Sequence, residues 1–396
     1  MPHVDRRQIL KLLAALGGGG LVGACGTSEA STDDEPVDAD PIRIGLIAPR
    51  SGVYKAIGDD IRNGFQLFLE LNENRLGGYP VELIGADEGD SADSGKAAVD
   101  TLLKQDVLAL TGVVDSSVML GIRDMVEQAK VPLVASNASP TSLQSVFYIW
   151  RTSYVNDEAG QALGPYVKAN TKGRVSTISP QTPAGTDAVN GFRQSFGPGD
   201  SRLRPPLWTG STASPSDDAL DTQITRLLAQ QPESVFCFFA GDAAVRFLRR
   251  LHEAGYRKKI FGPGFLTEGN VLSELKPAEA ENITTALNYS SDLKNGPNRE
   301  FASAYRKAHS VAPSTYAMAS YDAAQVLDKA IRIVEGEPTP PAVNLALGRV
   351  GQVDSPRGPW QFNQPRTPQQ KWYLRQVRTE GQVLANVLVE ELGTLG

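Results

Sequence analysis

The 396-residue chain contains little histidine. Outside the N-terminal segment only His252 and His309 remain, in helical stretches far apart in sequence, so neither a histidine-rich metal site nor a Ser-His-Asp centre is expected. The acidic stretch DEGDSADSG lacks the spacing and the closing glutamate of an EF-hand, and we expect a solvated loop there. No GxxxxGK[ST] phosphate loop is present. We therefore expect that the protein is not an enzyme and that it has no metal site and no cofactor.

The chain also lacks a long hydrophobic run and a basic excess. Its only apolar stretch near the start is broken by four glycines, residues 17–20, and falls short of the about 20 apolar residues that span a bilayer. The net charge is -6, which argues against a nucleic-acid partner. The apolar content of 41% and the length of the chain predict two globular domains.

The first 24 residues have the layout of an export signal: a basic start, a weakly apolar middle and small residues at the end. DRRQILK (residues 5–11) resembles the twin-arginine signal, and VGAC resembles the lipobox of bacterial lipoproteins. The resemblance implies cleavage after residue 24 and a lipid on Cys25, which becomes the N-terminus. The alternative is an ordinary cleaved signal in which Cys25 is incidental.

A short acidic segment separates Cys25 from the globular body. Residues 26–40 carry six acids and almost nothing apolar, so residues 25–40 are predicted to be a lipidated cysteine and a solvated linker. The second cysteine, Cys237, lies in the apolar run SVFCFFAG, where a free cysteine behaves as a small hydrophobic residue. We do not expect a disulfide between them.

From residue 41 onward, β-rich apolar runs alternate with helical patterns, and the alternation recurs after residue 150. The predicted strands are 42–48, 108–114, 131–136, 174–179, 234–240 and 259–262. Nearly continuous apolar runs are typical of parallel strands that are buried on both faces. The sequence therefore predicts an α/β fold with two doubly wound parallel-sheet lobes. Ligands of such sheets bind outside the carboxyl ends of the strands, which predicts a cleft between the lobes.

Small hydrogen-bonding residues follow three neighbouring strands of the first lobe. Asp115 or Ser116 should start the helix after strand 108–114, and a helix N-terminus attracts carboxylates. SNASPTSL follows the next strand and APRSGVYKAIGDD the first. Such residues also cap helices and form turns without any ligand. Three of these turns at one sheet edge favour a binding site.

Three motifs in combination give the chain a specific family resemblance. SGxxxxxG followed by NG (residues 51–64), the SYDA helix (320–323) and GPWQFN (358–363) together resemble the branched-chain amino-acid-binding family. These are the type I periplasmic-type binding proteins of ABC importers, and the resemblance covers residues 41–390. It implies a clamshell with a first lobe of residues 41–152 and 287–357, and a second lobe of residues 153–286 and 358–396. A three-stranded hinge is implied near residues 151–154, near 286–289 and before Gly358.

The resemblance also assigns site residues in the first lobe. The family binds the ligand carboxylate through a serine, a threonine and backbone groups, which correspond here to Ser116, Ser139 and the backbone of Asn137. A large apolar side chain before GD corresponds to Ile57.

The second lobe departs from the amino-acid-binding pattern. Two aromatic positions of the family correspond to Ala184 and Ala240, and the acid that pairs the ligand's ammonium corresponds to Gly264. A buried unpaired ammonium costs several kcal/mol, so an α-amino acid is a poor ligand unless another acid substitutes. The missing rings are expected to leave room for a bulkier solute.

Three acids are candidates for that substitution: Asp187, Asp242 and Glu268. Asp242 opens a predicted helix and is either its cap or a ligand contact. Tyr54 and Tyr154 either line the cleft or pack near the hinge.

These residues and the resemblance predict an extracytoplasmic, lipid-anchored receptor for a small organic solute, an amino acid, amide or related carboxylate. It would close by hinge motion and deliver the solute to the permease subunits of a branched-chain-amino-acid-type ABC importer, as a monomer held to the membrane by its N-terminal lipid. A sensor that regulates a signalling partner with the same clamshell is the alternative, and fold alone does not separate the two. The missing catalytic groups argue against an extracytoplasmic enzyme.

Overall fold

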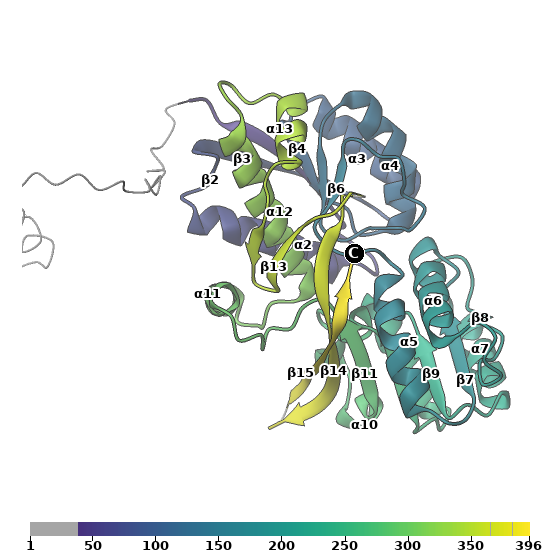
Figure 1. The fold of residues 1–396 in the computed structure, drawn as a ribbon. Helices are drawn as coiled ribbons and strands as arrows, with labels where there is room; N and C mark the ends of the chain where they lie inside the picture. Colours follow the sequence, from purple (N-terminus) through teal and green to yellow (C-terminus); the bar gives the residue numbers. More distant parts are fainter. Residues whose placement is uncertain (1–38, 365, 382) are drawn as a thin grey trace, which may run out of the picture. The chain divides into compact units, whose positions relative to one another are not determined.

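The computed structural model describes residues 39–396 except 365 and 382. The export signal, Cys25 and most of the acidic linker therefore lie outside the described residues. Figure 1 shows two sheets, each flanked by helices, and we call each sheet with its helices a lobe.

The first sheet has six strands in the spatial order β2-β3-β1-β4-β5-β6. The strands are β1 (Ile42–Ala48), β2 (Arg75–Leu76), β3 (Tyr79–Asp87), β4 (Ala109–Gly112), β5 (Leu133–Ala135) and β6 (Ile149–Arg151). All neighbours are parallel except β2, which forms an antiparallel pair with β3. The predicted parallel sheet is thus confirmed, with strand ends trimmed by one or two residues.

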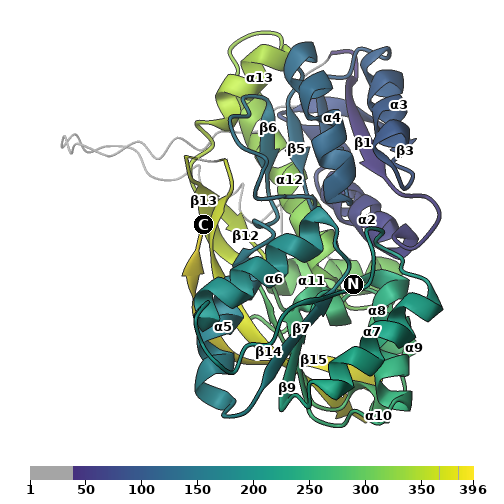
Figure 2. The ribbon, with the colours of Figure 1, turned by 90° about the vertical axis from the view of Figure 1, so that its right-hand side faces the viewer.

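Helices cover both faces of the first sheet (Figure 2). They are α2 (Lys55–Leu71), α12 (Thr315–Ile333) and α13 (Pro340–Leu347) on one face, and α3 (Ala92–Leu103) and α4 (Ser116–Ala129) on the other. Successive side chains of β1 point to opposite faces, so Ile44 and Leu46 pack in the α2–α12 layer while Ile47 packs with α3 and α4. A strand buried on both faces explains the continuous apolar run in the sequence.

The second sheet has the spatial order β12-β13-β14-β11-β10-β9-β7-β8, with β15 paired to β14. Its parallel part comprises β7 (Val175–Ser179), β8 (Leu207–Trp208), β9 (Ser234–Cys237), β10 (Lys259–Pro263) and β11 (Ile283–Leu287). Its antiparallel part comprises β12 (Val353–Ser355), β13 (Gly358–Phe362), β14 (Pro368–Glu380) and β15 (Val383–Leu395). The long β14–β15 pair was not predicted from the sequence.

Helices also cover both faces of the second sheet. These are α5 (Glu158–Asn170) and α6 (Pro183–Phe196) on one face, and α7 (Asp217–Ala229) and α8 (Gly241–Glu253) on the other. Short helices η2 (Gly264–Thr267), α9 (Val271–Glu274) and α10 (Pro277–Ala280) follow β10, and α11 (Gly296–His309) precedes α12. Cys237 is free and fully buried in the α7–α8 layer, as the apolar run around it predicted.

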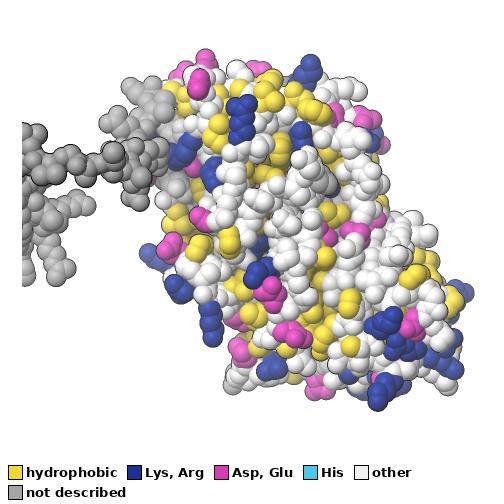
Figure 3. Space-filling view, viewed as in Figure 1, with side chains coloured by type: hydrophobic (Ala, Val, Ile, Leu, Met, Phe, Trp, Pro, Cys, Tyr) yellow, Lys and Arg dark blue, Asp and Glu magenta, His cyan; other side chains and the backbone are white. Residues whose placement is uncertain are grey.

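The surface of the described chain is ordinary for a globular protein. On the face shown in Figure 3, side chains of both charge signs are interspersed over both lobes. Within residues 39–396, none of the helices combines the length and the hydropathy required to cross a membrane.

The three segments that were predicted to cross between the lobes meet at one backbone carbonyl. The Ser153 oxygen accepts hydrogen bonds from Asn288 Nδ2, Arg357 Nη1 and Gln370 Nε2, each at 2.9 Å. Arg357 Nη2 also donates to the Thr152 oxygen at 2.6 Å. Segments that are more than 200 residues apart in sequence are thereby tied together. That they act as a hinge stays a prediction.

A buried ion pair anchors this junction. Arg357 Nη2 lies 2.8 Å from Asp322 Oδ2, and the two side chains are 1% and 0% exposed. The same carboxylate oxygen accepts hydrogen bonds from Ser355 Oγ at 2.7 Å and Trp360 Nε1 at 3.0 Å. Because both charges are desolvated, neither can be lost alone without leaving the other unpaired.

We expect Arg357→Met to lower the free energy of unfolding by ~3–5 kcal/mol, because the Asp322 carboxylate would be left buried without its countercharge. Urea denaturation measures the loss. A double variant that also carries Asp322→Asn should recover part of it, since the unpaired charge is gone. As a control, Lys104→Ala removes an exposed ion pair between the C-cap of α3 and Asp100 and should cost under about 1 kcal/mol. Equal effects of Arg357→Met and Lys104→Ala would contradict this account.

Candidate functional site

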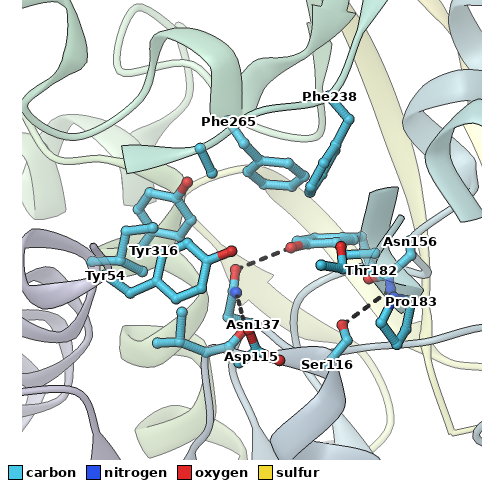
Figure 4. A pocket seen from close by; sticks show the side chains of 15 residues that line it. Tyr54, Asp115, Ser116, Asn137, Asn156, Thr182, Pro183, Phe238, Phe265 and Tyr316 are labelled. Carbon is cyan, nitrogen blue, oxygen red and sulfur yellow. Dashed lines mark hydrogen bonds between the residues drawn. The ribbon is translucent and has the colours of Figure 1, made fainter. Parts of the chain in front are cut away.

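A small cavity of about 30 Å³ lies between the two lobes, at the carboxyl ends of strands from both sheets (Figure 4). The first lobe contributes the turns after β4 and β5 and the start of α2, and the second lobe contributes the ends of β7, β9 and β10. Fifteen residues line the cavity: Tyr54, Ile57, Val114, Asp115, Ser116, Asn137, Tyr154, Asn156, Thr182, Pro183, Ala184, Phe238, Ala240, Phe265 and Tyr316. The cavity thus lies at the position that was predicted for the cleft, between the lobes at the carboxyl ends of the strands.

Ser116 is the first residue of α4, as the sequence predicted for Asp115 or Ser116. Asp115 is the N-cap, and its carboxylate accepts a hydrogen bond from the Ser117 backbone N–H at 2.6 Å. Asn156 Nδ2 donates to Ser116 Oγ at 3.1 Å. Because the hydroxyl oxygen already accepts this bond, its own hydrogen is free to be donated into the cavity. Ser116 thus presents a donor at a helix N-terminus, where an anionic acceptor is stabilised.

Asn137 is held by its neighbours on two sides. The Tyr154 hydroxyl donates to Asn137 Oδ1 at 3.0 Å, and Asn137 Nδ2 donates to the Val114 carbonyl at 2.8 Å (Figure 4). The resemblance assigned the backbone of Asn137 to the ligand, and its carbonyl accepts a hydrogen bond from Ser153 Oγ at 3.0 Å. The side chain rather than the carbonyl is therefore the part of Asn137 that shapes the cavity.

Aromatic rings form much of the cavity wall. Tyr54, Tyr154, Phe238, Phe265 and Tyr316 come from both lobes, and the Phe265 ring lies 4.8 Å from that of Tyr154 and 6.0 Å from that of Tyr316, centroid to centroid. Within the described part of the chain, the hydroxyls of Tyr54 and Tyr316 have no hydrogen-bond partner, although Tyr316 is only 2% exposed. Burial raises the pKa of both phenols, so both remain protonated and able to donate.

Four of the predicted contacts, Ile57, Ser116, Ala184 and Ala240, lie on the cavity wall together with Asn137. Phe238 and Phe265 line the same small cavity as the two alanines, and that the alanines leave room for a bulkier solute stays a prediction. Neither phenylalanine was identified from the sequence. The strand prediction 234–240 placed Phe238 inside a strand, whereas β9 ends at Cys237 and leaves Phe238 free to face the cavity.

The structure places three other predicted residues away from the cavity lining. Ser139 is fully buried, with its Oγ 3.5 Å from Arg151 Nη1. A Cβ at Gly264 would meet Leu287 and the Arg375 guanidinium at 2.7 Å, so this position faces the protein interior and the next residue, Phe265, faces the cavity. Asp242 is exposed in the first turn of α8, and the N-cap of that helix is Ala240, so the cap interpretation of Asp242 is also wrong.

The remaining candidate acids do not line the cavity either. Glu268 Oε1 accepts from Arg375 Nη1 at 2.6 Å and Glu268 Oε2 from the Thr315 N–H at 2.8 Å. Asp187 accepts hydrogen bonds from Thr141 and Asn156. Among the fifteen lining residues Asp115 is the only acid, and one of its oxygens caps α4. None of the second-lobe residues that line the cavity therefore carries a carboxylate that could pair with an ammonium group of a ligand.

The residues of the acidic stretch after β3 mostly cap and support helices. Ser91 is the N-cap of α3 and forms a capping box with Ser94. Across the residues that the structure describes, no group of three or more potential metal ligands is found.

Known proteins with similar sequences and folds identify the family of this chain. The sequence matches the family described as "Periplasmic binding protein" over residues 41–382. The chain belongs to this family. Its relatives include the Leu/Ile/Val-binding protein homolog 6 of Brucella melitensis, 27% identical over 86% of this chain and 88% of that one, and the Leu/Ile/Val-binding protein BraC3 of Rhizobium johnstonii, 23% identical over 81% and 87%. They identify a type I binding protein of the Leu/Ile/Val-binding group.

Solved structures support the same fold. A solute-binding protein of an ABC transporter from R. palustris, in complex with benzoate, is 25% identical with a TM-score of 0.81, covering 90% of this chain and 97% of that one. The branched-chain amino acid transporter substrate-binding protein LivJ of Streptococcus pneumoniae, in complex with isoleucine, has a TM-score of 0.77 at 19% identity, covering 89% and 100%. This binding protein therefore has the family and fold of solute receptors, and the family implies an extracytoplasmic location.

A buried acid of this binding protein supports the turn that carries Ser116. Glu88 is 0% exposed, and its two oxygens accept the backbone N–H groups of Val114 and Asp115, each at 2.7 Å. Desolvation raises the pKa of Glu88 to about 8, against the lowering effect of these hydrogen bonds.

We expect Glu88 to make the folded protein less stable as the pH rises from about 5 to about 8. In this window the folded state keeps a proton that the unfolded chain has lost, so the free energy of unfolding falls with pH, by at most ~1.4 kcal/mol per pH unit for one proton. Glu88→Gln should flatten that decline in urea denaturation at several pH values. The exposed Glu82→Gln on β3 is the matched control and should leave the slope unchanged. An unaltered slope in Glu88→Gln would contradict the raised pKa.

Proposed function

We propose that this binding protein is a lipid-anchored receptor that captures a small aromatic carboxylate and delivers it to an ABC importer. The observation that carries the proposal is the cavity wall: aromatic rings and unpaired hydroxyl donors, with no acid among the lining residues of the second lobe. A solute that fits it has hydrogen-bond acceptors, an apolar planar body and no ammonium group.

The acceptor end of the solute is expected at Ser116. This hydroxyl has its hydrogen available and stands at the N-terminus of α4, where the helix dipole favours a carboxylate. The Tyr54 and Tyr316 hydroxyls supply further donors that no described protein group accepts. A hydrogen bond from such a hydroxyl to a solute oxygen contributes about 0.5–1.5 kcal/mol net.

The body of the solute is expected against the rings of Phe238, Phe265 and Tyr154. Offset or edge-to-face packing against aromatic rings adds about 0.5–1.5 kcal/mol beyond the area buried. An α-amino acid would instead bring an ammonium into a wall without a second-lobe carboxylate, at the cost of an unpaired charge. The benzoate that is bound to the R. palustris relative supports an aromatic acid as the solute class.

Solute entry requires the lobes to separate, because the cavity is far below the about 300–1,000 Å³ of typical ligand sites. The segments that cross between the lobes around Ser153 would serve as the hinge. The lobes of the proposed clamshell are residues 41–152 with 287–357, and residues 153–286 with 358–396. The family supports delivery to permease subunits, and the N-terminal resemblance to lipoproteins supports attachment through Cys25.

A thermal-shift panel tests the solute class. Benzoate and 4-hydroxybenzoate should raise the melting temperature, and a ligand at 100 times its dissociation constant adds about 2.7 kcal/mol of stability. Leucine and isoleucine should give no shift. The Ser116→Ala variant should bind the aromatic acid at least tenfold more weakly, corresponding to ~1.4 kcal/mol. A shift with the branched-chain amino acids alone would contradict the aromatic class and leave a solute receptor. No shift with any solute, at any concentration, would count against the receptor function.

The lipid anchor has its own test in the cell. Cys25→Ser removes the thiol that accepts the lipid, so the protein should move from the membrane fraction to the soluble extracytoplasmic fraction. Fractionation followed by immunoblotting measures the change, and Cys237→Ser, which alters the buried cysteine, is the control that should stay with the membrane. Membrane retention of Cys25→Ser would rule out the anchor.

A further inference from the structure

One carboxylate joins the two lobes beside the cavity without facing it. Asp187 lies in α6 of the second lobe, and Thr141 lies in the segment between β5 and β6 of the first lobe. The Thr141 backbone N–H donates to Asp187 Oδ2 at 3.0 Å, and its hydroxyl donates to Oδ1 at 2.6 Å. Both carboxylate oxygens thus bind the opposite lobe, in the charge-assisted geometry that gives the stronger hydrogen bonds in proteins.

Asn156 connects this contact to the cavity wall. Its Nδ2 donates to Asp187 Oδ2 at 3.2 Å and to Ser116 Oγ at 3.1 Å. An amide nitrogen carries two hydrogens, so one can serve each acceptor. Asn156 and Ser116 are each 5% exposed, which shields both bonds from water. The connected path runs from Thr141 through Asp187 and Asn156 to Ser116, and it crosses between the lobes at both ends.

This connected path determines where the hydroxyl hydrogen of Ser116 points. While Asp187 holds Asn156, the Asn156 amide points a hydrogen at Ser116 Oγ, and the serine hydrogen is left for the solute. If the lobes separate, Thr141 leaves Asp187, and the carboxylate loses two of its three hydrogen-bond donors. The geometry of the solute donor is therefore tied to the closed arrangement of the lobes.

We propose that Asp187 is a clasp that favours the closed lobes without solute and, through Asn156, orients the Ser116 hydroxyl toward it. The closure step stands on the interlobe contacts alone, and the orientation of Ser116 rests on the function proposed above. Since a ligand shifts an equilibrium only by its differential affinity for the two states, a protein that is partly closed beforehand binds more tightly.

Small-angle X-ray scattering of the protein without solute tests the clasp. Asp187→Ala should increase the radius of gyration relative to the unaltered protein. Thr141→Val, which removes the hydroxyl bond and keeps the backbone bond, and Asp187→Asn, which keeps one acceptor oxygen, should each give a smaller increase. Asp221→Ala is the matched control, because the Asp221 carboxylate pairs with Arg250 of the same lobe, and it should leave the radius unchanged.

Binding kinetics with benzoate give the second readout. Asp187→Ala should weaken binding about tenfold or more, mainly through faster dissociation, as lost closed-state contacts act on the off-rate. Urea denaturation of each variant separates this effect from a loss of folding. An unchanged radius of gyration in Asp187→Ala would overturn the clasp, whatever the solute proves to be. An increased radius with no benzoate binding in the unaltered protein would support the clasp and reject the aromatic solute.

Discussion

The Arg357–Asp322 ion pair is the contact on which the junction between the lobes depends. It is almost completely buried, and the same guanidinium binds the carbonyls of Thr152 and Ser153, where the chain first passes from one lobe to the other. A buried charge is tolerated only when its partners satisfy it, so the positions of the crossing segments are coupled. The cavity lies next to this junction. These buried bonds tie together the segments that connect the two walls of the cavity.

The cavity wall combines two kinds of group that act differently on a solute. The hydroxyl donors of Ser116, Tyr54 and Tyr316 orient the solute, because a hydrogen bond is strong only when the acceptor lies close to the O–H axis. The rings of Phe238 and Phe265 give area and shape without preference for charge. With Asp115 as the sole acid of the lining and engaged at a helix cap, charge recognition is left mainly to the helix N-terminus.

The sequence predicted the features that depend on periodicity or on short-range chemistry. The parallel strands and the helix start at Ser116 belong to this class, whereas the wall positions of Ile57, Ala184 and Ala240 were implied by the family resemblance. The errors occurred where a displacement of one residue turns a side chain to the opposite direction. Gly264 and Phe265 are adjacent in a single 3₁₀ turn, yet one faces Arg375 and the other the cavity. Tyr316 and the clasp residue Asp187 acquire their roles from contacts between distant segments, which no local pattern records.

Helix α12 has a further consequence for how the chain folds. Its residues, 315–333, complete a helical layer that α2 begins on the first sheet, whose β1 strand starts at Ile42, so that face is only partly covered until most of the chain has been synthesised. The second sheet likewise acquires its β14–β15 edge only from the last residues. Such long sequence separations between contacting elements slow folding, because loop closure must precede the stabilising contact. Both lobes thus need elements from the C-terminal part of the chain, α12 for the first and the β14–β15 pair for the second, before their packing is complete.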